Sequence, residues 1–274
     1  MRAPAMSATS GLRRMRFPGM AVSIGLLLLI LGVSPASADQ CPQAESPIAT
    51  DRPDVTNSSQ VVPKGSFQSE NGVNFSQRDG GHAFDGTNSR LRLGVAPCLE
   101  VLVDLPTYVA AVDGPLSSGF TNVSPAIKWQ ISPDPGRIDL SATFGAGLPT
   151  GTRAIAGPGA QPYVQFPWSW ALDGGWGISG MVTDFFVPID PVNKLTTETT
   201  FVIERELGKN AFAFVEYVGD YHLYGGPAYL INSGGGYHIT PTQQIDLHLG
   251  VGLNNNAPAY IFGIGYSFRF DHLF

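Results

Sequence analysis

The sequence predicts an all-β protein, a transmembrane antiparallel up-and-down β-barrel of about 12 strands. From Phe67 onward, apolar and polar residues alternate in segments of roughly ten residues, the length with which a tilted strand crosses a bilayer. Short and long links alternate between these segments, as they do between the two ends of such a barrel. Beyond the N-terminal leader, no apolar run is long enough for a membrane-spanning helix.

The N-terminus has the features of a secretory signal peptide, predicted over residues 1–38. Four arginines precede an apolar run from Ala21 to Val33, and Ala36–Ala38 provides an A-x-A cleavage site. The apolar run is too short to span a membrane as a helix. A lipid anchor on Cys41 is disfavoured, because Asp39 and Gln40 stand where a lipoprotein signal needs small residues. We therefore expect an exported chain.

Residues 39–66 are polar, rich in proline and without a strand period, as the T-D-R-P-D sequence from Thr50 to Asp54 illustrates. They are predicted to form a periplasmic N-terminal segment, and residues 67–274 the barrel. Removing the leader takes away four of the 16 basic residues and no acid, which leaves 12 bases against 22 acids and a formal charge of −10. Such acidity argues against nucleic acid as a partner.

Each predicted strand should expose one apolar face to lipid and turn the other face inward. The segments are 67–76, 88–96, 99–108, 120–131, 137–148, 162–170, 172–185, 195–207, 211–220, 226–239, 243–253 and 258–270.

The links differ in length in a regular way. Tight turns with Gly, Pro or Asn are expected at 96–98, 132–136, 173–175, 208–210 and 240–242, whereas longer links are expected at 77–87, 109–119, 149–161, 186–194, 221–225 and 254–257. Short periplasmic turns and long external loops would place both termini in the periplasm. The Pro149–Gln161 loop could fold inward as a constriction or lie outside as a mobile loop, and its sequence favours neither.

The last segment alternates most clearly, with aromatic or aliphatic residues at every second position from Tyr260 to Phe270. The opposite face is small or charged, and the chain stops at Phe274. This resembles the C-terminal strand of bacterial outer-membrane barrels, which the barrel-assembly machinery reads. The resemblance implies an assembly signal at Tyr266, Phe268, Phe270 and Phe274, with outer-membrane lipid and that machinery as partners.

Alternation also places a set of ionisable side chains in the barrel lumen. They could form opposed rows of charge along an open pore and orient a polar solute. Alternatively they could pair into a salt-bridged interior that fills a narrow barrel. Asp246 and His248 share one face and could orient the histidine as a base, although polar neighbours are expected on any lumen face. The lumen candidates are Glu70, Arg90, Arg92, Glu100, Asp104, Lys128, Asp139, Glu198, Glu204, Asp246, His248 and Arg269.

The two cysteines allow one disulfide in an exported chain. Cys41 belongs to the N-terminal segment and Cys98 to a predicted periplasmic turn, so both would lie on the same side of the membrane. Two free thiols are the alternative.

No sequence feature favours catalysis or a cofactor. Outer-membrane lipid enzymes hold a catalytic His and Ser on the outer rim, but no histidine here has a serine two residues away. Neither cysteine has a second cysteine or a histidine at metal-ligand spacing. We expect no enzyme, no metal and no cofactor.

Several short motifs together resemble a known family. They are T-D-R-P-D at 50–54, P-K-G at 63–65 followed by Glu70, G-L-P-T-G at 147–151, P-Y-V-Q-F-P-W-S-W at 162–170 with the following D-G-G-W, and F-V-E-Y at 214–217. The chain is similar to outer-membrane transporters named after the meta-cleavage pathway of phenol degradation. The resemblance implies a barrel of about twelve strands and uptake of small solutes, aromatic compounds among them.

The predicted function is that of an outer-membrane channel or transporter for passive uptake of small solutes, including aromatic or hydrophobic compounds. The alternatives are an outer-membrane lipid-modifying enzyme, and a structural or interaction barrel with a closed, salt-bridged interior. The sequence specifies no oligomeric state.

Overall fold

The computed structural model describes residues 41–132, 138–189, 192–222 and 226–274. The predicted signal peptide, residues 1–38, lies outside this range, as do residues 133–136 of one predicted turn. Within the described residues, no helix has the length and apolar character that crossing a bilayer requires.

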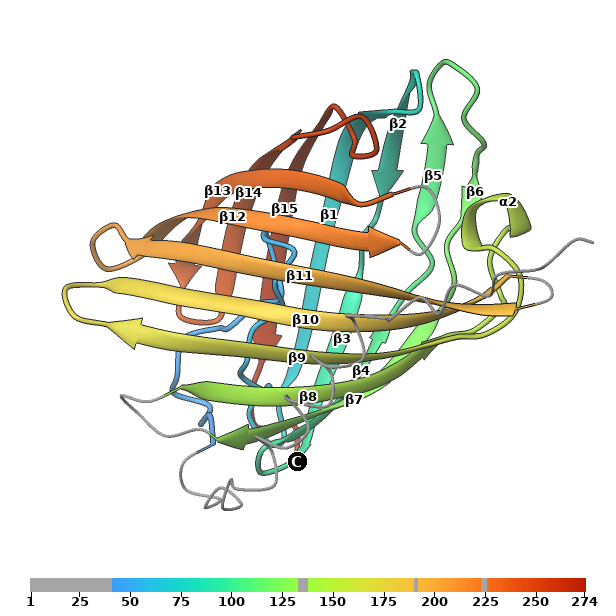
Figure 1. Cartoon of the computed structure of the whole chain (residues 1–274). Helices are drawn as coiled ribbons and strands as arrows, with labels where there is room; N and C mark the ends of the chain where they lie inside the picture. Colours follow the sequence, from blue (N-terminus) through green and yellow to red (C-terminus); the bar gives the residue numbers. More distant parts are fainter. Residues whose placement is uncertain (1–40, 133–137, 190–191, 223–225) are drawn as a thin grey trace, which may run out of the picture. The chain divides into compact units, whose positions relative to one another are not determined.

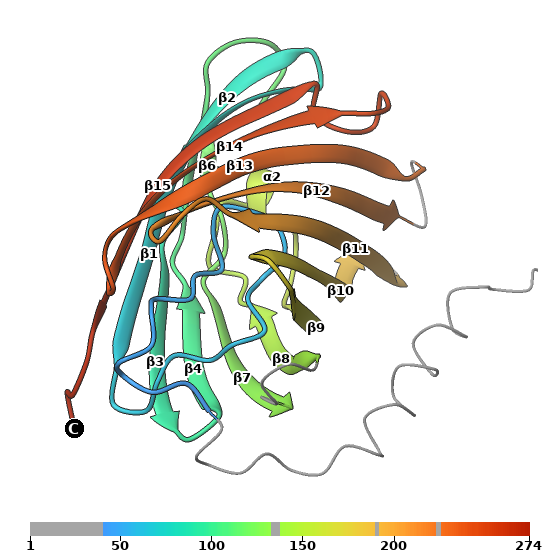
Figure 2. The ribbon, with the colours of Figure 1, turned by 90° about the vertical axis from the view of Figure 1, so that its left-hand side faces the viewer.

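The predicted antiparallel barrel is confirmed. Neighbouring strands pair around a ring that β15 and β1 close, from Phe67 opposite Phe270 to Gln77 opposite Tyr260 (Figures 1 and 2). The ring contains β1 (Phe67–Arg78), β3 (Arg90–Ala96), β4 (Leu99–Asp104), β7 (Ser124–Ser132), β8 (Asp139–Gly147), β9 (Gln161–Leu172), β10 (Trp176–Ile189), β11 (Val192–Glu206), β12 (Ala211–His222), β13 (Ala228–Thr240), β14 (Gln243–Gly252) and β15 (Tyr260–Phe270).

The two-residue period gives the barrel wall two different faces. On β14, Leu247 and Leu249 point outward and are 55% and 47% exposed, whereas the neighbouring inward residue Gln244 is 1% exposed. On β15, Phe262 and Ile264 are exposed and Ser267 is buried. An apolar outer face and a polar inner face are typical of a barrel that sits in a bilayer.

Three short strands extend the wall where the sequence predicts loops. They are β2 (Gly81–Gly86), β5 (Tyr108–Ala111) and β6 (Gly119–Phe120). In the chain, β2 precedes β3, β5 follows β4 and β6 precedes β7. The first half of β1 pairs with β3 and the second half with β2. Between the paired halves, Asn71 accepts a hydrogen bond from the Ser89 hydroxyl (2.8 Å), so a side-chain contact helps to bridge the interruption.

Another predicted long link, Phe186–Lys194, is shorter than expected. β10 continues to Ile189 and β11 begins at Val192, and Val187 pairs with Lys194. The tight turn at 173–175 is present, and Gly174 and Gly175 both have positive φ angles that favour glycine.

The predicted N-terminal segment, residues 39–66, is described from Cys41 onward. Residues 41–66 lie inside the barrel and bind inward side chains of β1, β3, β7, β12 and β14 (blue in Figures 1 and 2). As expected, the segment forms no regular strand. Lys64 makes one isolated bridge to Gly94.

The assignment of the outward face to lipid can be tested by placing an arginine on that face. We expect Leu247→Arg, near the middle of β14, to destabilise the membrane-embedded barrel by about 2–4 kcal/mol, because a charge at the bilayer midplane is poorly solvated. Urea unfolding in lipid vesicles measures the loss. Leu253→Arg, just after the strand, is the control and should cost about 0–1 kcal/mol. Equal losses at both positions would contradict the assigned faces.

Candidate functional site

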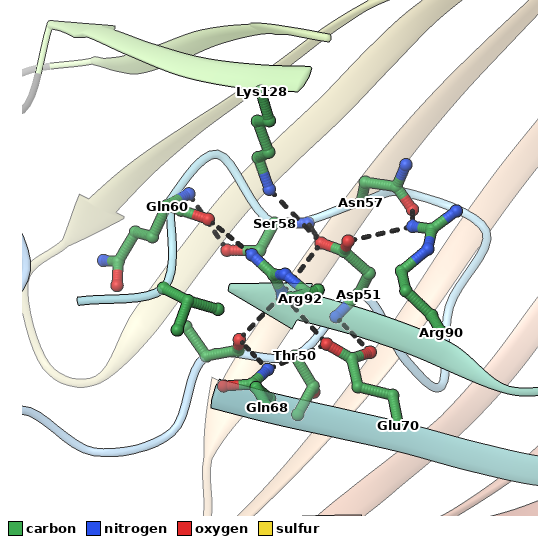
Figure 3. A network of polar contacts seen from close by, with 12 residues as sticks. Thr50, Asp51, Asn57, Ser58, Gln60, Gln68, Glu70, Arg90, Arg92 and Lys128 are labelled. Carbon is green, nitrogen blue, oxygen red and sulfur yellow. Dashed lines mark hydrogen bonds and ion pairs between the residues drawn. The ribbon is translucent and has the colours of Figure 1, made fainter. Parts of the chain in front are cut away.

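The densest group of buried charges surrounds Arg92 on β3 (Figure 3). The Arg92 guanidinium donates to Glu70 (Nη1–Oε1, 2.9 Å) and to Glu100 (Nε–Oε1, 3.0 Å), and Asp51 lies 3.4 Å from Nη1. Glu70 lies on β1 and Glu100 on β4, the two strands that flank β3, and both residues face inward. Alternation therefore brings two wall carboxylates to one wall arginine, and the N-terminal segment supplies the third.

Asp51 is the point at which the segment enters this network. Its carboxylate accepts from Arg90 (2.8 Å), Lys128 (3.3 Å) and the backbone N–H of Ser58 (2.9 Å). Burial alone would raise the pKa of Asp51, but the positive charges of Arg92, Lys128 and Arg90 outweigh it and hold the pKa below its usual value. Asp51 is consequently an anion that binds three wall cations.

Wall side chains also satisfy the backbone of the segment, which pairs with a strand only near its end, where Lys64 meets Gly94. Val62 N–H donates to Glu100 (2.6 Å), and Val61 N–H donates to Gln130 (3.2 Å). The Gln60 carbonyl accepts from Arg92 (2.9 Å). Buried backbone N–H and C=O groups need hydrogen-bond partners. The polar side chains of the lumen provide them for a segment that forms no regular strand.

Glu216 on β12 forms a second attachment. It accepts from the backbone N–H groups of Val55 (2.9 Å) and Thr56 (2.8 Å) and from the Thr56 hydroxyl (2.8 Å). Asn232 Nδ2 donates to the same carboxylate (2.9 Å).

Arg52 forms a third attachment, in which its guanidinium donates to Asp246 on β14 (3.1 Å), two strands from Glu216. The space that it occupies depends on glycine. A Cβ atom at Gly72 or at Gly265 would overlap the Arg52 guanidinium. Two strand glycines on adjacent strands therefore make room for one side chain of the segment.

The start of the segment is fixed near the closure of the barrel. Cys41 and Cys98 form a disulfide, with their Cα atoms 5.2 Å apart. Arg269 on β15 donates to the carbonyls of Ala44 (2.8 Å) and Ser46 (2.7 Å) and pairs with Asp271 (2.7 Å). The ion pair of Arg269 is therefore local, and its other donors hold the segment.

Two cavities lie on either side of the segment. One, of about 670 Å³, is lined by residues toward the long links, including Asn88, Thr107 and Asn122. The other, of about 320 Å³, is lined by residues near the short turns, including Trp176 and Glu206. Arg52 and Asn57 line both cavities. The stretch from Arg52 to Asn57 therefore separates two open volumes along the lumen.

The Pro149–Gln161 loop lies over the larger cavity. Its short helix α2 (Arg153–Ala156) lines the cavity with Ile155 and Ala156, while Arg153 is exposed. Asn122, in the link between β6 and β7, accepts from the backbone N–H of Gly151 (3.1 Å). The loop thus contributes Ile155 and Ala156 to the cavity lining, while most of its other residues are exposed.

The predicted lumen residues fall into distinct groups. Arg92, Glu100 and Lys128 line none of the described cavities, since each is at most 1% exposed and bound to the segment or to one another. Those that line cavities are Glu70, Arg90, Asp104, Glu198 and Glu204. The opposed rows of charge are thus not exposed along a pore in this state.

The remaining candidates do not form a catalytic pair. His248 contacts Asn232 (3.2 Å) and Asn74 (3.3 Å), whereas Asp246 binds Arg52. Asp139 lies on β8 opposite Ser169. Within the described chain, no group of three His, Cys, Asp or Glu side chains has the arrangement of a metal site.

Sequence reasoning named several wall residues that bind the segment, but it missed Glu216 on the wall and Asp51 and Arg52 in the segment itself. Asp51 and Arg52 belong to the T-D-R-P-D sequence, whose charges offered a signal because they flank a proline in an otherwise weakly charged stretch. Glu216 was ambiguous because it shares a face with Phe212 and Phe214. Phe214 and Glu216 are in fact both buried and face inward.

Comparisons with known proteins agree with this fold. The family model described as "Putative MetA-pathway of phenol degradation" matches residues 50–270. The crystal structure of the COG4313 outer membrane channel from Pseudomonas putida F1 is similar, with a TM-score of 0.60, 12% identity and coverage of 77% of this chain and 97% of that chain. The KdgM porin with disordered oligogalacturonate has a TM-score of 0.52, 9% identity and coverage of 75% and 99%. At these identities the likeness concerns the fold. No curated protein sequence gives a significant match.

The Arg92 network should be essential for stability. We expect Arg92→Met to cost about 3–5 kcal/mol, because it leaves buried carboxylates without their counterion. Denaturant unfolding of the refolded barrel measures the change. Arg205→Met is the control, since Arg205 lies over the Trp176 ring (4.7 Å) and should cost only about 0.5–1 kcal/mol. A loss at Arg92 no larger than the control's would show that the network is dispensable.

Proposed function

Because the chain belongs to this phenol-degradation family, we propose that it is an outer-membrane channel through which small solutes, aromatic compounds among them, diffuse passively. The observation that carries the proposal is the pair of cavities separated by the stretch from Arg52 to Asn57. In a membrane barrel with a polar interior, water-filled volumes that open toward both ends provide most of a permeation path.

The N-terminal segment is the gate of the proposed channel. It closes the path through side-chain contacts with the wall rather than through a strand ladder, so it can leave its position without breaking the barrel. Its middle portion is held by the contacts from Glu216 to Val55 and Thr56 and from Arg52 to Asp246. Asn57, at the end of this portion, is also bound to Arg90 (3.0 Å) and Gln165 (3.0 Å). Movement of this portion would join the two cavities.

The chemistry of the proposed channel is binding and exclusion, without a catalytic step. The second candidate is a closed structural barrel, which the burial of Arg92, Glu100 and Lys128 favours. Conductance in planar lipid bilayers separates the two. A folded protein that conducts at no voltage, alone or with its gate weakened, would be a structural barrel.

The C-terminal assembly signal stays a prediction within this proposal. Tyr266 and Phe270 are exposed on the outer face of β15, and Phe274 is 70% exposed at the chain end. These positions are accessible to an assembly factor and, after insertion, to outer-membrane lipid.

Weakening the Glu216 attachment should open the channel. Glu216→Ala leaves the Val55 and Thr56 N–H groups without their charged acceptor, a loss on the order of 3 kcal/mol that corresponds to roughly a hundredfold in the closed-to-open ratio. Single-channel recording should show a higher open probability. Glu206→Ala is the matched control, because Glu206 lines the smaller cavity but makes no described contact with the segment. Equal effects of the two variants would remove Glu216 from the gate.

The closed state should be favoured by mild acid. Removal from water and the nearby carboxylates of Glu216 and Glu204 raise the pKa of Asp54 well above its usual value. The docked segment thus binds a proton more tightly than the released one, and docking weakens as pH rises through this raised pKa. Asp51 has the opposite effect on docking, because its pKa is lowered in the docked segment. This effect is confined to pH values near and below the ordinary pKa of Asp51.

We therefore expect the open probability to increase between about pH 5 and pH 8. Asp54→Asn should flatten this dependence. A wild-type channel that closes as pH rises, or an Asp54→Asn channel with unchanged pH dependence, would contradict this role of Asp54.

A further inference from the structure

The polar lumen contains an apolar patch. Leu102 on β4, Ala126 on β7 and Tyr163 on β9 are buried together, and Phe185 on β10 packs against them. The Tyr163 and Phe185 rings lie 6.0 Å apart at an angle of 47°. All four residues occupy inward positions, where neighbouring strands mostly carry polar side chains. The patch therefore gives one side of the lumen an aromatic surface.

A cavity of about 270 Å³ lies against this patch. Tyr163, Phe185, Met181 and Val55 provide its apolar lining. It adjoins the 670 Å³ cavity, with which it shares a set of lining residues, so a solute in the larger volume can reach it. The shared residues are Asn57, Arg90, Asp104, Ser124 and Gln161. The volume of about 270 Å³ suits a molecule with a single ring.

The charge of this cavity is negative. Arg90 is the only base among its lining residues, and it is already bound by Asp104 (2.6 Å) and Asp51 (2.8 Å). Glu198 on β11 also lines the cavity, and in the described part of the chain no basic side chain pairs with it. Its neighbours across the strand ladders are Thr183 and Asp220. Glu198 is thus a carboxylate without a protein counterion beside an aromatic wall.

We propose that this cavity is a binding site for a small organic ammonium ion, in which Glu198 pairs with the charged nitrogen and Tyr163 and Phe185 contact the apolar part. A carboxylate and aromatic rings are the groups that stabilise such cations. An anion meets repulsion from Glu198, and a neutral solute gives it no counterion. The inference deepens the channel proposal by naming a solute class, but binding itself requires no conduction.

Calorimetric titration of the folded protein in detergent micelles tests the site. The probes are benzylammonium, benzyl alcohol and benzoate, which share a ring and differ in charge, and each is also titrated into micelles alone. Benzylammonium should bind at least roughly tenfold more tightly than benzyl alcohol, and benzoate should not bind. Glu198→Gln should weaken benzylammonium binding by a similar factor.

Two further variants complete the design. Glu204→Gln, in the separate 320 Å³ cavity, should leave benzylammonium binding unchanged. Phe185→Leu should weaken it several-fold, which keeps the test valid if Glu198→Gln fails to fold. Equal binding of all three probes, or full affinity in folded Glu198→Gln, overturns the site. Binding with no conductance would leave the site standing and remove the channel, whereas conductance without binding would do the reverse.

Discussion

The structure depends on the neutralisation of buried charge around Arg92. A guanidinium with 1% exposure is tolerable only when carboxylates surround it, and the barrel wall provides two of these, Glu70 and Glu100. Arg90 and Lys128 stand close by and need further anions. Asp51 of the N-terminal segment supplies the missing negative charge to all three bases. The segment is therefore part of the electrostatic balance of the wall.

Under the proposed gating, this balance would allow one chain to adopt a closed and an open state. In the closed state the segment excludes water, so each ion pair acts at low dielectric and is strong, while the cost of desolvation is high. When the segment moves, water replaces Asp51 as the partner of the three bases. Since hydration compensates much of the lost pairing, the two states can lie close in free energy even though the closed contacts are numerous.

The barrel was predictable because its signal is periodic. Leu247 and Leu249 are apolar and face outward, whereas Gln244 is polar and faces the lumen, so the residue type indicates the face. The segment has no such period, and its position inside the lumen follows from tertiary contacts alone. An inward Glu216 looks the same in sequence whether its partner is water or the backbone of Val55. The interruptions beside Asn71 were equally hidden, since Gly-rich strands such as β2 resemble loops.

The disulfide has a kinetic consequence for the segment. Cys41 is covalently fixed to Cys98, and Phe67 begins the first strand, so residues 42–66 form a loop tied to the wall at both ends. Such a tether keeps the loop at an effective concentration in the millimolar range near its own binding surface. Rebinding is then a unimolecular event that no dilution can slow. The proposed channel would therefore switch repeatedly between its closed and open states, because the released segment stays attached and rebinds.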